Sequence, residues 1–149
     1  ESSETQQSFL DKLSESSKAY QDFNLLIGDG KEYHYFNSRS SKAIKLTPGF
    51  YGLSNQLLNC DWPKVQIGKK HLKKAIDSHQ VEENLFGILS DNGDERPYSN
   101  SFIVGSVYGT RSQTVLTWNT KEELKFTEKI FVQAGELQSI NNISFSICS

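Results

Sequence analysis

Several residue types and patterns are scarce in this chain of 149 residues, and each shortage argues against a class of protein. The sequence contains no methionine and only two cysteines, Cys60 and Cys148, which are too few for a disulfide scaffold. No stretch approaches the roughly 20 apolar residues that a membrane-spanning helix needs, so we predict no membrane span. The formal net charge of −2 gives no general reason to expect binding to nucleic acid.

Metal ligands and phosphate-binding loops are also missing as sequence patterns. The three histidines, His34, His71 and His79, are not grouped with cysteines or carboxylates at the spacing of metal ligands, so we predict no metal site. The glycines within Ile27–Lys31 lie between two expected strands, whereas a dinucleotide-binding loop would open a helix.

The residues that are present favour one globular domain. Apolar residues make up 36% of the chain and aromatic residues 11%, which is enough for a hydrophobic core. We predict a single domain over residues 1–149, with a polar, flexible start over residues 1–8. Phe9, Leu10, Leu13 and Tyr20 then recur at near-helical spacing and predict a short amphipathic helix.

Apolar periodicity predicts the remaining helices and strands. Helices are expected over Pro63–Ser78 and Val81–Leu89, and tight turns at Asp29-Gly30 and Asn119–Glu123. The expected strands are Phe23–Ile27, Tyr33–Phe36, Ala43–Leu46, Tyr51–Ser54, Phe102–Val107, Gln113–Trp118, Leu124–Val132 and Ile143–Ile147. Strands, then helices, then strands indicate an α+β fold with mostly antiparallel strands and two to three helices.

The segment Thr47–Lys64 carries much of the functional information. Pro48-Gly49 predicts a turn, and Trp62-Pro63 predicts the start of a helix, because proline is favoured at the first helical position. Ser54 and Asn55 then lie at the end of an expected strand, where side chains can face a cleft.

A second informative segment is Tyr108–Leu116, followed by Phe126–Lys129 on the next expected strand. Together with Phe23–Ile27 and Thr47–Lys64, it resembles the C-terminal half of the transport and Golgi organisation family, also called the NRDE family after an Asn-Arg-Asp-Glu signature. The resemblance runs from about Phe23 to about Phe131.

Family members open with a cysteine next to the initiator methionine and carry their signature soon after it, and neither feature is present here. Because the chain starts at Glu1 and contains no methionine, we predict that it is the C-terminal portion of a longer family protein.

The resemblance implies an αββα sandwich of the N-terminal-nucleophile hydrolase type, in which this chain supplies part of each sheet. The implied mechanism uses an N-terminal cysteine thiolate as nucleophile and its own α-amino group as base. Cys60 and Cys148 are internal and cannot take that role, so we predict that this chain alone is inactive. Whether the longer protein is an enzyme stays open.

Asn55 and Arg111 occupy sequence contexts comparable to those of two catalytic residues in related acylases. The resemblance implies that the Asn55 amide donates to an oxyanion and that Arg111 steadies the same cleft, the two converging on one pocket. The alternatives are that Asn55 only turns the chain and that Arg111 forms a buried ion pair with an acid such as Glu128.

Four further residues are expected to line the cleft. The hydroxyls of Ser54 and Thr110 would hydrogen-bond a ligand, or would satisfy backbone groups at strand ends. The rings of Tyr51 and Tyr108 would pack near the same cleft, with adjacent glycines that allow close approach of backbone or ligand.

The expected helix from Pro63 presents a basic surface. The lysines of this helix, with one histidine among them, are candidates for binding an anionic group, and a solvated helix face is the alternative. They are Lys64, Lys69, Lys70, Lys73 and Lys74, with His71, and the main candidates are Lys69, Lys70 and Lys73. The ligands that the resemblance raises are haem and acyl lipids, with His34 or His71 as an axial ligand of haem.

The resulting hypothesis is a protein of Golgi and secretory organisation that also handles haem or lipid, with a hydrolase-like cleft that lacks its nucleophile. The alternatives are a non-enzymatic haem or acyl-lipid carrier and a structural interaction domain. The N-terminal half of the longer protein is the expected partner. The expected location is cytoplasmic, and the two finer alternatives are an association with the Golgi and a mitochondrial location.

Overall fold

The computed structural model describes residues 4–146 and divides the chain into two compact units, Glu1–Cys60 (unit 1) and Asp61–Ser149 (unit 2). Each unit contains one antiparallel sheet of three strands, and the described residues form three α-helices. The predicted α+β class is therefore confirmed. That residues 1–149 form one domain stays a prediction.

Unit 1 begins with helix α1 (Gln6–Ser16), which continues into the 3-10 helix η1 (Ser17–Ala19). Thr5 caps the helix, since its hydroxyl accepts a hydrogen bond from the Ser8 amide at 3.1 Å. Helix α1 therefore starts inside the segment predicted to be flexible. Its buried residue is Leu10, one of the four residues that predicted the helix, whereas Tyr20, another of the four, lies beyond η1 and is exposed.

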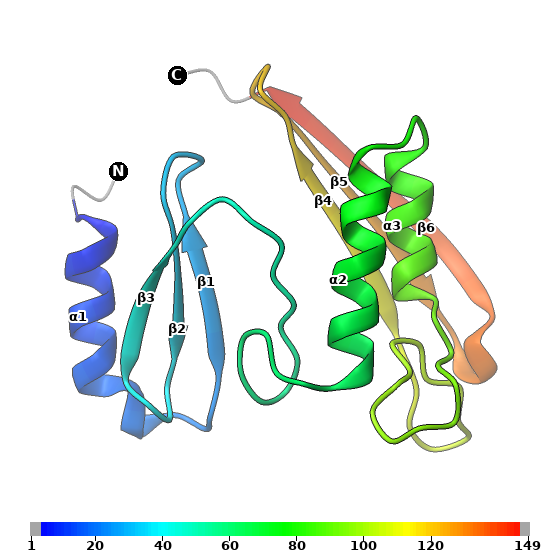
Figure 1. Cartoon of the computed structure of the whole chain (residues 1–149), viewed down its shortest axis with the longest axis horizontal. Coiled ribbons are helices and arrows are strands. Elements are labelled where there is room, and N and C mark those ends of the chain that lie inside the picture. Colours follow the sequence, from blue (N-terminus) through cyan, green and yellow to red (C-terminus); the bar gives the residue numbers. More distant parts are fainter. Residues whose placement is uncertain (1–3, 147–149) are drawn as a thin grey trace. The chain divides into compact units, whose positions relative to one another are not determined.

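The sheet of unit 1 contains strands β1 (Asn24–Gly28), β2 (Tyr33–Asn37) and β3 (Lys42–Leu46), close to the predicted bounds (Figure 1). The β1–β2 turn is tight, as predicted. The Asp29 carboxylate accepts hydrogen bonds from two backbone amides of this turn, each at 2.9 Å. Phe36, at the centre of the sheet, is 0% exposed.

The predicted strand Tyr51–Ser54 is wrong. Only Leu53 forms a β-bridge there, and its partner is Leu58 a few residues later. The backbone of Gly52 is hydrogen-bonded to Asn59, whose φ of 59° reverses the chain. The apolar run is therefore one arm of a closed loop, which has no neighbouring strand to extend.

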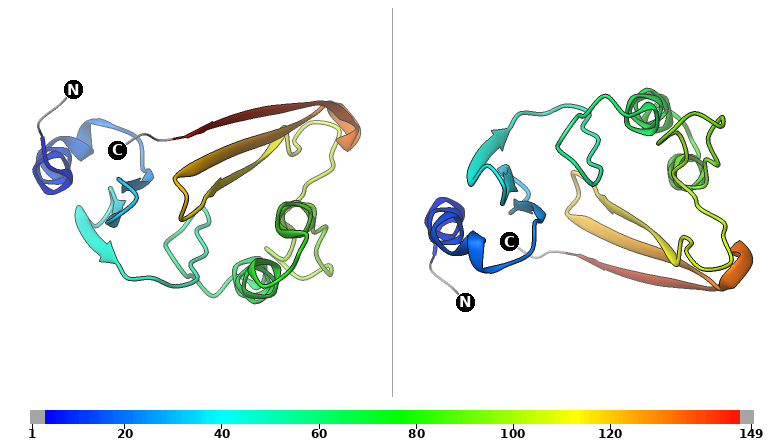
Figure 2. Two further views of the ribbon diagram at one scale, coloured as in Figure 1. Left: turned by 90° about the horizontal axis from the view of Figure 1, so that it is seen from above. Right: turned by 90° about the horizontal axis from the view of Figure 1, so that it is seen from below.

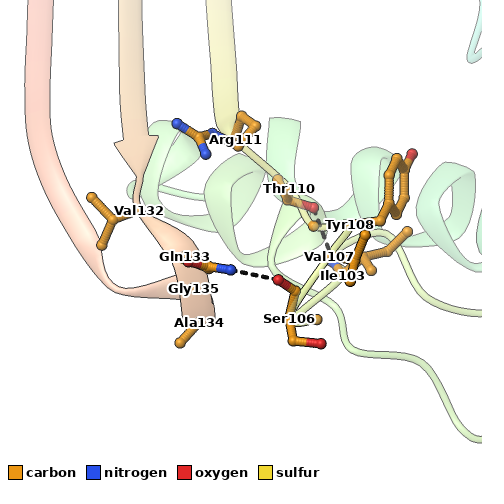
Figure 3. Close-up of a pocket in the computed structure, with 12 residues that line it drawn as sticks. Ile103, Ser106, Val107, Tyr108, Thr110, Arg111, Val132, Gln133, Ala134 and Gly135 are labelled. Carbon is orange, nitrogen blue, oxygen red and sulfur yellow. Dashed lines mark hydrogen bonds between the residues drawn. The ribbon is translucent and has the colours of Figure 1, made fainter.

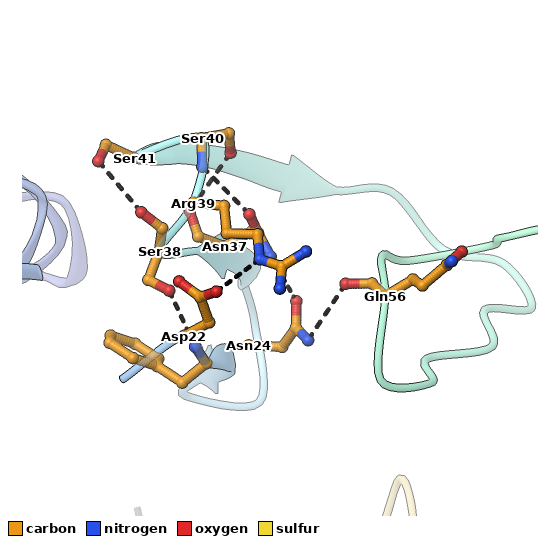
Figure 4. Close-up of polar contacts among 9 residues, drawn as sticks. Asp22, Asn24, Asn37, Ser38, Arg39, Ser40, Ser41 and Gln56 are labelled. Atoms are coloured by element: carbon orange, nitrogen blue, oxygen red, sulfur yellow. Dashed lines mark hydrogen bonds and ion pairs between the residues drawn. The ribbon is translucent and has the colours of Figure 1, made fainter. Parts of the chain in front are cut away.

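Polar contacts attach this loop, residues 47–60, to the sheet of unit 1 (Figure 4). The Asn24 side chain accepts hydrogen bonds from the Tyr35 hydroxyl at 2.6 Å and from the Asn37 amide at 2.8 Å. It donates to the backbone oxygen of Gln56 at 3.4 Å, and the Tyr35 hydroxyl accepts from the Leu58 amide at 3.3 Å. The loop is thus held to strands β1 and β2.

Unit 2 begins with helices α2 (Pro63–Ile76) and α3 (Val81–Leu89), both as predicted to within two residues. Pro63 is at the first helical position, and the Trp62 ring before it stacks on Tyr98 with ring centroids 4.3 Å apart. Figure 2 shows the two helices nearly end-on, lying on the same face of the unit 2 sheet.

The sheet of unit 2 contains strands β4 (Ser112–Trp118), β5 (Glu123–Phe131) and β6 (Leu137–Ser146). The 3-10 turn η2 (Gln133–Gly135) joins β5 to β6. Contacts with α3 identify the face under the helices: Lys125 pairs with Glu82, and the Lys129 ammonium lies 4.1 Å from the Phe86 ring centre. Strand β6 starts six residues before the predicted Ile143.

The predicted strand Phe102–Val107 is also wrong, because these residues form an irregular loop that precedes β4. Ile103 pairs with Thr110 of its own loop, so the segment closes on itself. Ile147 and Cys148 lie outside the described residues. Within residues 4–146 no helix has the length and apolar character that a bilayer crossing demands.

Candidate ligand-binding site

Three residues predicted to form the site, Tyr108, Thr110 and Arg111, line one pocket of unit 2 (Figure 3). The pocket, called the Arg111 pocket here, has a volume of about 260 Å³. One wall is the loop Ile103–Arg111, and the other is formed by Val132 and the turn η2. The predicted grouping of Tyr108, Thr110 and Arg111 is thus present within unit 2.

The loop wall is fixed at its base. The Thr110 amide donates to the Ile103 carbonyl at 2.9 Å, and the Thr110 hydroxyl accepts from the Ile103 amide at 2.9 Å. A Cβ atom on Gly105 would lie 2.4 Å from the Tyr108 carbonyl oxygen, which is too close for any other residue without movement. The turn at the tip therefore requires glycine at position 105.

The second wall was not predicted from the sequence. Gln133 donates its side-chain amide to the carbonyl of Ser106 and so connects the two walls (Figure 3). Ala134 adopts a φ of 70°, in the left-handed region, and Gly135 has a φ of 78°. The only feature of the sequence that indicates a turn at this wall is Gly135, which lies between two apolar runs.

Arg111 is exposed at the start of β4, and among the described residues it forms no ion pair. Its backbone carbonyl accepts a hydrogen bond from the Phe131 amide at 2.8 Å, which fixes the main chain at the pocket. The alternative of a buried ion pair with Glu128 is therefore wrong. The guanidinium can offer its fork of N–H groups to an anion.

The other two predicted residues of this pocket behave differently. The Thr110 hydroxyl satisfies the backbone of Ile103, which is the alternative given for it above. Tyr108 is 73% exposed, so its ring is available at the rim of the pocket. A Cβ atom on Gly109 would lie 3.1 Å from the Ile103 carbonyl, so this glycine permits close approach of backbone.

Asn55, Ser54 and Tyr51 belong to unit 1, in the loop 47–60. Asn55 is exposed in the turn between Leu53 and Leu58 rather than at a strand end. The Tyr51 hydroxyl donates to the Thr47 carbonyl at 2.7 Å. Convergence of Asn55 and Arg111 on one cleft stays a prediction, as does the hydrolase-like mechanism that needs it.

The predicted lysine surface lies on α2. Lys70 and Lys73 are exposed, and Lys69 is half-buried. A hollow of about 240 Å³ between α2 and α3 is lined by two further members of the predicted basic surface, His71 and Lys74. Binding of an anion by Lys69, Lys70 and Lys73 stays a prediction.

Haem fits the surroundings of the buried His34 poorly. The ring of His34 is hydrogen-bonded at Nδ1 to the Gln6 side chain at 3.0 Å, which by itself is compatible with ligation through Nε2, so the lining of the cavity carries the argument. The adjoining cavity in unit 1 is lined by three carboxylates, Glu4, Asp29 and Glu32, and by one lysine, Lys45, which pairs with Glu32 at 2.5 Å. Hydrogen bonds from the backbone amides of Glu32 and Lys31 lower the pKa of Asp29. Carboxylates are ionised at neutral pH even at their ordinary pKa, and the excess of them in this cavity would repel the propionates of haem.

Comparison with known proteins gives one consistent result. A family model described as Transport and Golgi organisation 2 matches residues 1–133. A mouse protein named Transport and Golgi organization 2 homolog is 29% identical over 152 residues, covering 82% of this chain and 55% of the relative. A human protein named Transport and Golgi organization protein 2 homolog is 30% identical with the same coverage. The chain spans about half the length of these curated relatives.

Proposed function

Since this chain belongs to the Transport and Golgi organisation 2 family, we propose that it binds the acidic end of an acyl lipid in the Arg111 pocket. The family is named for transport and Golgi organisation, and lipid handling is the finer function that we propose for this chain. We propose a cytoplasmic setting beside Golgi membranes, which the description of the family supports. A mitochondrial setting stays a prediction.

The exposed guanidinium of Arg111 is the observation that carries this proposal. A buried or surface arginine commonly pairs with a neighbouring carboxylate, yet Arg111 has no such partner among residues 4–146. A carboxylate or phosphate held by its two-pronged N–H groups gains roughly twice the strength of a neutral hydrogen bond. Tyr108 adds an aromatic ring at the rim, against which an acyl chain can lie.

The size of the pocket favours an acyl lipid over haem. Sites that enclose a whole drug-sized ligand usually measure roughly 300–1,000 Å³. The Arg111 pocket, at about 260 Å³, is suited to the charged end of a ligand, with the remainder outside it. Haem binding keeps less support, because the cavity beside His34 is lined by carboxylates.

We also propose that the open face of the unit 2 sheet packs on a second sheet, as in an αββα sandwich. Cross-strand pairing places Leu116, Phe126 and Ile143 in one apolar row. A second row contains Trp118, Leu124 and Phe145. The N-terminal half of a longer family protein, the partner predicted from the sequence, would contribute strands to that second sheet.

Fluorescence titration with a dansyl-labelled fatty acid tests the lipid proposal, with unlabelled palmitate, palmitoyl-coenzyme A and haem as competitors. We expect Arg111→Gln to weaken palmitate binding roughly tenfold or more, because a charge-assisted contact contributes about 1.5–3 kcal/mol. Arg39→Gln is the matched control, since Arg39 is an exposed arginine of unit 1 that pairs with Asp22 at 2.7 Å.

The methyl ester of palmitate distinguishes binding of the acidic end from binding of the acyl chain. It lacks the negative charge, so Arg111→Gln is expected to leave its affinity unchanged. Equal palmitate affinity in the wild type and Arg111→Gln would contradict the role of Arg111. Absence of palmitate and palmitoyl-coenzyme A binding in the wild type would overturn the proposed function.

A further inference from the structure

The tip of the loop Ile103–Arg111 exposes large apolar side chains to solvent. Val107 is 99% exposed, and Val104 and Tyr108 are also more than half exposed. Single exposed apolar residues are common on soluble proteins, but here three lie within five consecutive positions. This tip, residues 104–108, is therefore an apolar protrusion that the fold leaves uncovered.

The protrusion is held in place rather than collapsed onto the unit. Two hydrogen bonds between Ile103 and Thr110, each 2.9 Å long, clamp the base of the loop. The side chain of Gln133 holds the carbonyl of Ser106 at the tip. Because the backbone is already fixed, burying the two valines in a membrane or against a partner would cost little further conformational entropy.

The charge pattern around the tip is suited to one kind of surface. No charged residue occurs from Pro97 to Thr110, and the exposed Arg111 follows directly. Tyrosine is enriched at the interface between membrane and water, where Tyr108 would lie. A positive charge beside an apolar tip favours an anionic surface.

A protein partner explains these features less well. A stable protein–protein interface buries more than about 1,000 Å² in total, which three side chains on a narrow loop do not supply. Insertion of a few apolar side chains into the boundary between headgroups and acyl chains needs no such area. We propose that residues 104–108 insert into the surface of an anionic lipid bilayer, with Arg111 on the headgroup side.

This proposal goes beyond the ligand pocket, because insertion of the tip needs no bound ligand. Its test is co-sedimentation of the chain, without added ligand, with vesicles of phosphatidylcholine alone or with 30% phosphatidylserine. We expect binding to the anionic vesicles and weaker binding to phosphatidylcholine alone. Val107→Asp is expected to lower the partition coefficient roughly tenfold or more, since a fully exposed valine loses its insertion energy.

The matched control is Leu57→Asp, which places the same charge at a half-exposed apolar residue of unit 1. It is expected to bind vesicles like the wild type, and circular dichroism checks that both variants fold. Val107→Trp is the complementary variant and is expected to bind more tightly, because tryptophan prefers the interface.

A local probe reports insertion directly. A nitrobenzoxadiazole label is attached to Val107→Cys after Cys60 and Cys148 are replaced by serine, and its emission is expected to shift to the blue on anionic vesicles. The proposal is overturned if the wild type does not sediment with anionic vesicles, or if Val107→Asp and Leu57→Asp bind equally. A label that stays in an aqueous environment on sedimented protein would also overturn it.

Discussion

Both units pack helical structure on one face of a three-stranded antiparallel sheet, but they treat the opposite face differently. In unit 1 the loop 47–60 is hydrogen-bonded to that face through the Tyr35 hydroxyl. Tyr35 lies on the opposite face of β2 from its neighbour His34, and it is only 3% exposed. In unit 2 the corresponding face exposes Leu116, Ile143 and Phe145. Within residues 61–146 no segment covers these side chains to the same extent.

The difference shows how a loop can close a sheet face without adding a strand. In unit 1 a few polar contacts are enough, because Asn24 and the Tyr35 hydroxyl bind loop backbone at Gln56 and Leu58. In unit 2 the loop before β4 instead forms one wall of the Arg111 pocket, opposite Val132 and η2. Within residues 61–146 the apolar face of the unit 2 sheet is therefore left exposed.

Phe36→Ala breaks the core of unit 1 and should have the largest effect on stability. Phe36 is fully buried at the centre of the sheet, so we expect a loss of about 3–5 kcal/mol. Ile44→Ala on the neighbouring strand β3 is the control and should cost less than about 1 kcal/mol, because Ile44 is half-exposed. Urea denaturation followed by circular dichroism measures both, and equal losses would contradict the described core.

Tyr35→Phe removes the hydroxyl that closes the face of unit 1. We expect a loss of about 1–3 kcal/mol, because the Leu58 amide loses its acceptor and the Asn24 oxygen loses one of its two donors. Hydrogen exchange should become faster in the loop 47–60 and change little in α1. Tyr33→Phe, at an exposed position of the same strand, is the control. Unchanged exchange in the loop would show that it is held by other contacts.

Glu82→Gln tests the contact between Glu82 and Lys125 on the helix-covered face of unit 2, and how the stability of this unit depends on pH. The hydrogen bond from Lys125 lowers the pKa of Glu82 below its usual 4.5. The ionised carboxylate therefore stabilises unit 2 above pH 4.5, and this contribution is lost as the pH falls through the lowered value. Both side chains are partly exposed, so we expect less than about 1 kcal/mol.

Denaturation at pH 7 and pH 3 measures this effect. The loss of stability between the two pH values should be smaller in Glu82→Gln than in the wild type, and Glu83→Gln, at an exposed position of α3, serves as the control. A larger loss in Glu82→Gln would have the wrong sign for a carboxylate that is stabilised in its ionised form.

Leu116→Thr tests the open face of unit 2 and should have the smallest effect. Leu116 is 59% exposed, so in this chain we expect a change of less than about 0.5 kcal/mol. Val115→Ala, one residue away on the buried face, should cost several times more. A loss of more than about 1.5 kcal/mol for Leu116→Thr would mean that the face is covered, and the contrast between the two units would then fail.

The helices and most of the strands were predictable because their signals are local. Proline at position 63 and the apolar spacing of α2 and α3 predict helices wherever the segments lie in space. The turns at Asp29 and Asn119 were predictable for the same reason, since each side chain bonds the backbone of its own turn.

The two wrong strands show the limit of such reasoning. Tyr51–Ser54 and Phe102–Val107 contain the apolar and aromatic residues of strands, yet each closes on its own loop through bonds to Asn59 and Thr110. Whether an extended run finds a neighbouring strand depends on distant parts of the chain. The site was predictable only in part for the same reason: Tyr108–Arg111 is one segment, whereas Gln133–Gly135 joins it only on folding.

The sequence alone indicated the α+β class and the starts of α2 and α3, because these depend on neighbours a few positions away, whereas the segment around Arg111 was suggested by the family resemblance. Tertiary packing decided that Arg111 has no carboxylate partner among residues 4–146 and that η2 forms the second wall of the pocket. It also decided that the loop 47–60 closes one sheet face in unit 1, while the apolar face of the unit 2 sheet is left exposed. Those outcomes depend on which surfaces meet, and burial and pairing energies between distant segments govern that choice.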